Sequence, residues 1–136
     1  MFVVLEPDSN CFLCLLEEIE MNNQELPLYK ATLDFCVYVD TIVKNQEKYH
    51  KYGIGEELRR NTREMFYVVN RVMYVRDKEA SLKALVEKCD ETKSILLLAK
   101  AINAFKSFKQ FEHSSGMAVN ICKQSQAWLK SVRVSK

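Results

Sequence analysis

Apolar residues recur at steps of three and four along most of this chain, which is the spacing of one face of an α-helix. The chain has 136 residues but only three glycines and two prolines, so little in its composition interrupts a helix. We therefore predict an all-α domain. Four apolar stripes follow one another along it: Leu28 to Ile42, Leu58 to Met73, Leu82 to Ala99, and Phe111 to Val132.

The boundaries of these stripes predict where the helices begin and end. Pro27 suits the first turn of a helix, and Asp77 can cap a later one. The fourth stripe alternates steps of four and three straight across Gly116, so one helix should continue through that glycine. Short connections between long helices favour an antiparallel up-down four-helix bundle. The predicted helices cover about residues 27–46, 56–76, 78–108 and 111–133.

Two apolar features bear on how the bundle packs. Ile95 to Leu98 is apolar on nearly every side, which predicts burial by several neighbouring helices at once. Ile121 and Trp128 project from one flank of the fourth helix. Either they form an exposed contact site or the first or third helix covers them, and the sequence leaves both alternatives open.

Residues 1–20 differ in charge from the rest of the chain. They carry five acidic residues and no lysine or arginine, whereas the other 116 residues hold all 20 basic residues and 13 acidic ones. We predict an acidic extension over 1–20 outside the bundle, and the four-helix bundle within 21–136. An excess of seven positive charges attracts polyanions, although solvated lysine faces are also common.

The cysteines and the apolar runs predict a soluble, cytoplasmic protein with no membrane partner. The five cysteines are an odd number and, apart from Cys11 and Cys14, are widely spread, which is typical of a reducing compartment. The N-terminus lacks the basic start and the apolar run of a secretory signal. The longest apolar stretch elsewhere, Ile95 to Ala99, is too short to cross a bilayer.

The motifs of common catalytic and metal sites are incomplete. Cys11-x-x-Cys14 has the spacing of half a zinc site, but no second pair follows it, and a short apolar helix is the simpler interpretation. Glu47-x-x-His50 has the spacing used in di-metal bundles, and it occurs only once. No nucleophile motif or phosphate-binding loop is present. We predict a non-enzymatic protein with no catalytic residues, metal or cofactor.

The second helix carries the most informative polar pattern. Three arginines and two tyrosines fall within about 80° of one another, opposite the apolar stripe. Guanidinium groups match phosphate oxygens and tyrosine rings stack on unpaired bases, which favours RNA binding. The same residue types are enriched at subunit interfaces, and a plain solvated face is a third alternative. The five residues are Arg60, Arg63, Tyr67, Arg71 and Tyr74; the further candidates for nucleic-acid or partner binding are Arg59, Lys93 and Lys100.

Three stretches resemble the accessory variability determinant (Avd) family of diversity-generating retroelements. They are Leu26-Pro-Leu-Tyr-Lys30, Glu47-Lys-Tyr-His-Lys-Tyr-Gly-Ile-Gly-Glu56 and Gln126-Ala-Trp-Leu-Lys-Ser131. The last is similar to the family's terminal Gly-Gly-Trp-Leu-Lys-Ser. The chain departs from the family where Lys44-Asn-Gln-Glu47 replaces the usual Phe-Pro-Lys, and where the basic residue of the third helix is displaced to Lys100.

The resemblance implies a four-helix protomer of a ring-shaped homopentamer with a basic surface. Such a protein binds the retroelement reverse transcriptase and nucleic acid, as template RNA or cDNA, and supports mutagenic retrohoming without being an enzyme. The alternative is a structural oligomer of the type encoded in ribosomal RNA intervening sequences, with an unknown partner. The usual Asn-Ile-Ala-Glu-Gly of that family has no counterpart in Asn70-Arg-Val-Met-Tyr74, which favours the retroelement interpretation.

Overall fold

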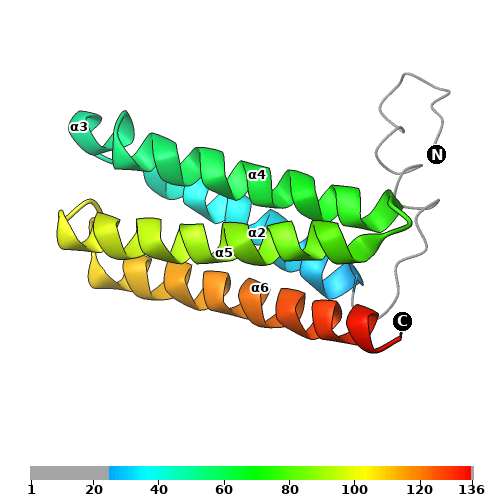
Figure 1. The fold of residues 1–136 in the computed structure, drawn as a ribbon. Helices are drawn as coiled ribbons and strands as arrows, with labels where there is room; N and C mark the ends of the chain where they lie inside the picture. The colour runs from blue at the N-terminus through cyan, green and yellow to red at the C-terminus, as the bar shows by residue number, and fades with distance from the viewer. Residues whose placement is uncertain (1–24, 136) are drawn as a thin grey trace, which may run out of the picture.

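The computed structural model describes residues 25–135, and they form an all-α bundle (Figure 1). The acidic segment 1–20 and the Cys11-x-x-Cys14 pair lie outside the described residues. The helices are α2 (Glu25–Lys44), the short α3 (Lys48–Lys51), α4 (Ile54–Tyr74), α5 (Lys78–Ala101) and α6 (Phe108–Val134).

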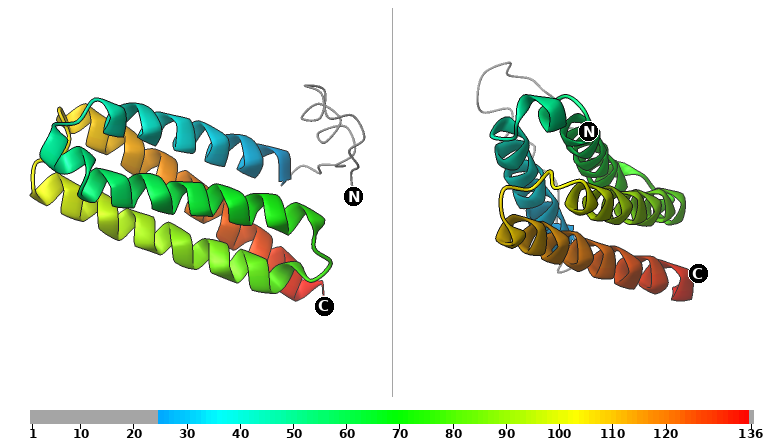
Figure 2. Two further views of the ribbon diagram at one scale, coloured as in Figure 1. Left: turned by 90° about the horizontal axis from the view of Figure 1, so that it is seen from above. Right: turned by 90° about the vertical axis from the view of Figure 1, so that its left-hand side faces the viewer.

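The four long helices pack as an up-down bundle, as the sequence predicted. Helix α4 packs between α2 and α5, while α6 packs against α5 and α2, so that α4 and α6 lie diagonally across the bundle (Figure 2). The turn of α3 and the α5–α6 loop lie at one end, and the α4–α5 turn lies at the other. Each long helix therefore buries one side and leaves the opposite side exposed.

The apolar stripes that defined the helices form one core. Phe35 and Val39 of α2 meet Met65 of α4, together with Leu85 of α5 and Ala118 of α6, all fully buried. Removing such side chains from water is the main favourable term in folding, at about 25 cal/mol per Å² of apolar surface. Ile121 and Trp128 are buried in the same cluster, so a neighbouring helix covers them and they form no exposed contact site.

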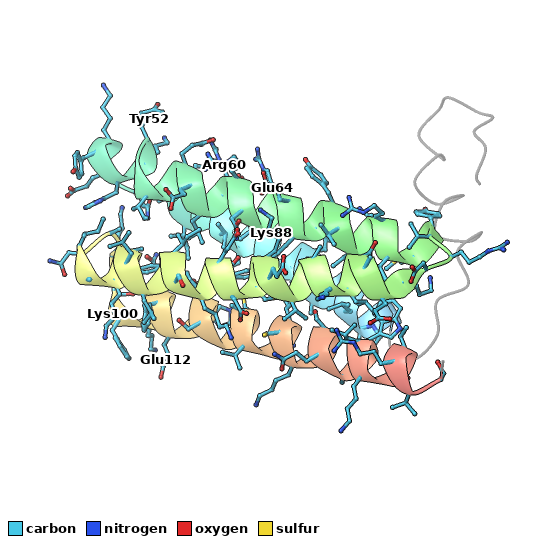
Figure 3. All side chains as sticks on the ribbon, viewed as in Figure 1. Tyr52, Arg60, Glu64, Lys88, Lys100 and Glu112 are labelled. Carbon is cyan, nitrogen blue, oxygen red and sulfur yellow. The ribbon has the colours of Figure 1, made fainter. Side chains whose placement is uncertain are left out.

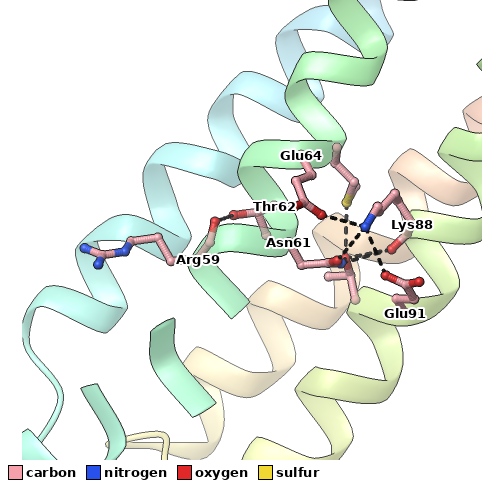
Figure 4. Close-up of polar contacts among 8 residues, drawn as sticks. Arg59, Asn61, Thr62, Glu64, Lys88 and Glu91 are labelled. Atoms are coloured by element: carbon pink, nitrogen blue, oxygen red, sulfur yellow. Dashed lines mark hydrogen bonds and ion pairs between the residues drawn. The ribbon is translucent and has the colours of Figure 1, made fainter. Parts of the chain in front are cut away.

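A buried polar cluster fixes the register of α4 against α5 (Figure 4). The Asn61 amide donates to Thr92 Oγ1 at 2.5 Å and to the Lys88 carbonyl oxygen at 3.2 Å. Thr92 Oγ1 lies 3.2 Å from Met65 Sδ. Because a buried polar group that loses its partner costs about 1–3 kcal/mol, a shift of either helix along the other is disfavoured.

The connection between α4 and α5 is tight, and its polar groups are satisfied locally. The Asp77 carboxylate accepts a hydrogen bond from the Glu79 backbone N–H, which confirms Asp77 as the N-cap of α5. The Lys78 ammonium donates to the carbonyl oxygens of Val72 and Val75, at 2.7 and 3.2 Å. Carbonyl groups left unpaired at the end of α4 are thereby bonded.

Helix α5 ends at Ala101, well before the expected end near residue 108. Asn103 has φ 60, and the Ala104 N–H donates to the Ala99 carbonyl oxygen while the Asn103 N–H donates to that of Lys100. This is a Schellman motif, which terminates helices where a residue tolerates the left-handed conformation. Ser107 then caps α6 by accepting from the Gln110 N–H, and α6 runs through Gly116 as predicted.

The expectation that Ile95 to Leu98 is buried by several neighbours is wrong for the single chain. Leu96 is buried, but Leu97 and Leu98 are 62% and 51% exposed. Among the described helices, α5 has only α4 and α6 beside it, so none of them covers its outer side. No helix within residues 25–135 is both long and apolar enough to span a membrane.

Candidate nucleic-acid and partner interface

The outer face of α4 presents the predicted arginine and tyrosine side chains to solvent. We call this set the α4 face, and all its members are exposed: Arg60, Arg63, Tyr67, Arg71 and Tyr74. The opposite side of the same helix is buried, including Leu58, Met65 and Val72. The period of 3.6 residues thus separates polar and apolar residues as the sequence predicted.

Two of the predicted arginines pair with Asp40 of α2. Arg63 Nη2 lies 3.1 Å from Asp40 Oδ1, and Arg59 Nη1 lies 4.0 Å from the same oxygen. Arg59 also pairs with Glu56. Since these groups are a third to a half exposed, each ion pair contributes little to stability. Their main effect is to occupy the guanidinium groups. Because Arg59 reaches Asp40 of α2, it lies on the flank between α2 and α4 rather than on the α4 face.

Arg60 and Arg71 form no ion pair within residues 25–135. They lie on either side of Tyr67, whose side chain is 60% exposed. At a rise of 1.5 Å per residue, Arg60 and Tyr67 are separated by about 10 Å along the helix, and Tyr67 and Arg71 by about 6 Å. The α4 face therefore offers two unpaired guanidinium groups with an exposed aromatic ring between them.

Glu64, four residues after Arg60 on α4, is turned toward α5. Glu64 Oε1 lies 2.6 Å from Lys88 Nζ, and Lys88 also lies 3.3 Å from Glu91 (Figure 4). The hydrogen bond to Glu64 raises the pKa of the Lys88 ammonium, so the ammonium stays charged near neutral pH. Glu64 is thereby partly neutralised, which reduces its repulsion of an anion bound beside Arg60.

Lys93 and Lys100 lie on different surfaces from the α4 face. Lys93 Nζ is 3.3 Å from Asp90 Oδ1 and 3.6 Å from Cys122 Sγ, which places it at the seam of α5 and α6. Lys100 Nζ lies 5.5 Å and 5.1 Å from the ring centroids of Phe108 and Phe111 (Figure 3). Both lysines belong to α5 and are turned toward α6, which lies diagonally opposite α4. The structure therefore does not bring them together with the arginines.

The structure also exposes basic and aromatic residues that sequence reasoning left out. Lys109, Lys123 and Lys130 are exposed on α6, and the last two are seven residues apart on one side of the helix. Tyr49 on α3 and Tyr52, the C-cap of that helix, are 82% and 69% exposed. The heptad spacing of the α6 lysines could have been read from the sequence. The tyrosines lie in a single helical turn, which has no periodicity to detect.

The chemistry available elsewhere in residues 25–135 is limited. They contain no group of three or more His, Cys, Asp or Glu side chains placed to hold a metal ion. Burial raises the pKa of the Cys89 thiol to about 12 and also raises that of Cys36, so both thiols stay protonated near neutral pH. An open groove between α2 and α6 is lined by Tyr38, His113, Met117 and neighbouring residues.

Comparison with known proteins adds no family: the chain matches no protein-family model, no curated protein and no solved structure. The classification of the chain therefore rests on its own helices, which form an all-α four-helix bundle.

Proposed function

We propose that this chain is a non-enzymatic accessory subunit that binds nucleic acid and a retroelement reverse transcriptase, and so supports mutagenic retrohoming. The nucleic-acid part rests on the α4 face, where Arg60 and Arg71 are unpaired within the described residues and flank the exposed ring of Tyr67. Arginine forks bind phosphate oxygens, and a ring accepts a stacked base. This combination is the single observation that carries the proposal.

The polymerase part rests on the resemblance to the Avd family. The second stretch that carries it, Glu47 to Glu56, contains the α3 turn and the start of α4, and the third ends α6 with Trp128 in the core. A reverse transcriptase gene beside the gene for this chain is the genomic context that the proposal expects. A neighbourhood without one would count against the polymerase part and leave the nucleic-acid part standing.

We further propose a homo-oligomer, with a ring of five subunits as the resemblance implies. Leu97 and Leu98 on the outer side of α5 are mostly exposed in the single chain, and Ile102 beyond the helix end is also exposed. Contiguous exposed apolar side chains are typical of surfaces that a partner covers. Light scattering at micromolar concentration should give a multiple of 15.9 kDa, and a monomeric mass would remove this part of the proposal.

The alternative is a structural oligomer of the ribosomal RNA intervening-sequence type, which binds no nucleic acid through the α4 face. The exposed leucines of α5 favour this candidate as much as they favour the first. The two differ in what the α4 face does. In the structural oligomer it is solvated or covered by another subunit, so charge reversal there would either change nothing or dissociate the oligomer.

A salt titration with a structured RNA separates the two candidates. Changing Arg60, Arg63 and Arg71 together to Glu should abolish binding at moderate salt while leaving helicity and oligomeric mass unchanged. Three lost phosphate contacts should flatten the slope of log affinity against log salt by roughly 2–3 units.

A second triple variant with the same change in net charge is the control for a general effect of charge on binding. Changing Lys83, Lys123 and Lys130 to Glu alters the charge by the same amount on exposed positions of α5 and α6. If both triple variants lose binding equally, the α4 face is not the site. Dissociation of the oligomer by the arginine variant alone would assign that face to a subunit interface.

A further inference from the structure

The α3 turn exposes two aromatic rings where most proteins bury them. Tyr49 and Tyr52 are 82% and 69% exposed, and no other tyrosine within residues 25–135 exceeds 60%. Tyr49 lies in α3 and Tyr52 is the C-cap residue of that helix, three residues later, a spacing that places two side chains on the same side of a helical turn. Large rings left in water on an ordered element indicate a partner that covers them.

Basic residues lie close to the two tyrosines along the chain. Lys44, Lys48 and Lys51 lie within the same ten residues as a single acidic group, Glu47. Lys51 Nζ lies 6.0 Å from the centroid of the Tyr52 ring, near the outer limit of a cation–π contact, so its ammonium remains able to bind another anion. None of the three lysines forms an ion pair with an acidic side chain of residues 25–135. The partner should therefore be anionic.

The turn that carries the rings is hydrogen-bonded internally, and the residue before it is bonded to the neighbouring loop. The N–H groups of Lys51 and Tyr52 donate to the carbonyl oxygens of Glu47 and Lys48, at 2.8 and 3.1 Å. Gln46 Nε2, just before the turn, donates to the Ala104 carbonyl oxygen of the α5–α6 loop at 3.1 Å. A ring on a fixed backbone loses little conformational freedom when a ligand stacks on it.

The turn also continues the α4 face. Helix α3 packs against the start of α4, and Tyr52 and Arg60 lie along the same edge of the bundle (Figure 3). A strand whose phosphates bind Arg60 can therefore reach the α3 rings without crossing the bundle. A nucleic acid offers bases for the rings and phosphates for both the α3 lysines and Arg60, so one polyanion can occupy the turn and the α4 face together.

We propose that the α3 turn is a stacking platform for an unpaired segment of nucleic acid, with two bases on Tyr49 and Tyr52 and adjacent phosphates on Lys48 and Lys51. This inference rests on the proposed function, because the bases on the two tyrosines belong to the same nucleic acid whose phosphates bind the α4 face. It adds that single-stranded nucleic acid binds through its bases as well as its phosphates.

The test compares a fluorescent single-stranded oligonucleotide of about 12 nucleotides with an abasic strand of the same length, by anisotropy with the full chain. The wild-type protein should bind the strand with bases more tightly. Tyr49→Ala with Tyr52→Ala should weaken that binding about 25-fold, or about 2 kcal/mol at 1.4 kcal/mol per tenfold, and leave the abasic strand unaffected. Tyr49→Phe with Tyr52→Phe should restore it, because phenylalanine keeps the ring.

Two further variants separate the bases from the phosphates. Lys48→Gln with Lys51→Gln should weaken both strands and reduce the salt slope by about 1.4 units, at about 0.7 per phosphate on a single strand. Phe108→Ala removes a ring of similar exposure from the start of α6 and should leave both strands bound as before. Circular dichroism should show unchanged helicity in all variants.

The outcomes distinguish this inference from the proposed function. Equal wild-type affinity for the two strands, or unchanged binding after both tyrosines become alanine, would overturn the platform while structured RNA can still bind the α4 face. If the protein with Tyr49→Ala and Tyr52→Ala loses binding to anionic vesicles or to an acidic protein but binds nucleic acid as before, the platform is overturned too. If the wild-type protein binds neither strand nor structured RNA, the proposed function fails with it.

Discussion

Two glycines in helices should respond in opposite ways to the same change to alanine. Gly55, in the first turn of α4, is buried, and a Cβ there would lie 2.1 Å from Gln46 Oε1 and 2.8 Å from the His50 carbonyl oxygen. The first atom belongs to a side chain that can move, but the second belongs to the backbone of α3. Gly116, in α6, has nothing within 4 Å of such a Cβ. Neither glycine has a positive φ, so backbone strain does not enter the comparison.

The expected magnitudes follow from these contacts. At Gly55 the added methyl overpacks the site at a cost of about 1–3 kcal/mol. Displacing Gln46 also breaks its hydrogen bond to Ala104, at about 1 kcal/mol, while the higher helix propensity of alanine offsets at most about 1 kcal/mol. Gly55→Ala should therefore lower the free energy of unfolding by about 2 kcal/mol. Gly116→Ala should raise it by up to about 1 kcal/mol.

Thermal melting followed by circular dichroism measures both changes. At about 4 °C per kcal/mol for a domain of this size, Gly55→Ala should lower Tm by about 8 °C and Gly116→Ala should raise it by up to about 4 °C. The Gly55 variant should also weaken single-stranded binding, since α3 must move to admit the methyl group. A Gly55→Ala protein that melts at or above the wild-type temperature would refute the close packing of α3 on α4.

Two further predictions concern stability. Deleting residues 1–20 should change Tm by less than about 5 °C, the equivalent of about 1 kcal/mol, and a larger fall would show that the acidic segment packs on the bundle. Because burial raises the pKa of Cys89 to about 12 from 9.0, the folded state holds the thiol proton more tightly than the unfolded state does. The contribution of this group to the free energy of unfolding should be complete below pH 9 and lost as pH rises toward 12, and Cys89→Ala should remove that part of the alkaline decline in denaturant melts.

The positions of the four long helices could be predicted because each one buries a stripe whose period is fixed by backbone geometry. The short α3 was not predicted, since it buries no residue. The end of α5 could not be predicted in the same way. It depends on Asn103 taking a left-handed conformation, which asparagine tolerates but does not require. The exposure of Leu97 and Leu98 was also missed, since apolar residues all round a helix indicate burial only when enough neighbours surround it.

The candidate site was only partly predictable, for a related reason. The angular spacing of Arg60, Tyr67 and Arg71 places them on one face whatever the helix packs against. Which arginines remain unpaired depends on contacts between distant residues, as when Asp40 of α2 takes up both Arg59 and Arg63. The period of a single helix carries no information about the charges of its neighbour.

The distribution of ion pairs determines which part of the α4 face binds a polyanion most strongly. The paired groups lie in the first half of α4, where Arg59 and Arg63 meet Asp40 and Glu64 meets Lys88. An anion there competes with carboxylates already in contact, and its net gain is small. Within α3 and α4, the Lys and Arg side chains that form no ion pair with a described residue are Lys48, Lys51, Arg60 and Arg71. A strand running from α3 toward Arg71 would meet cations at both ends, with Tyr67 between them. This arrangement favours one extended contact over two separate sites, and it makes the rings of α3 and α4 the groups that distinguish bases from bare phosphate.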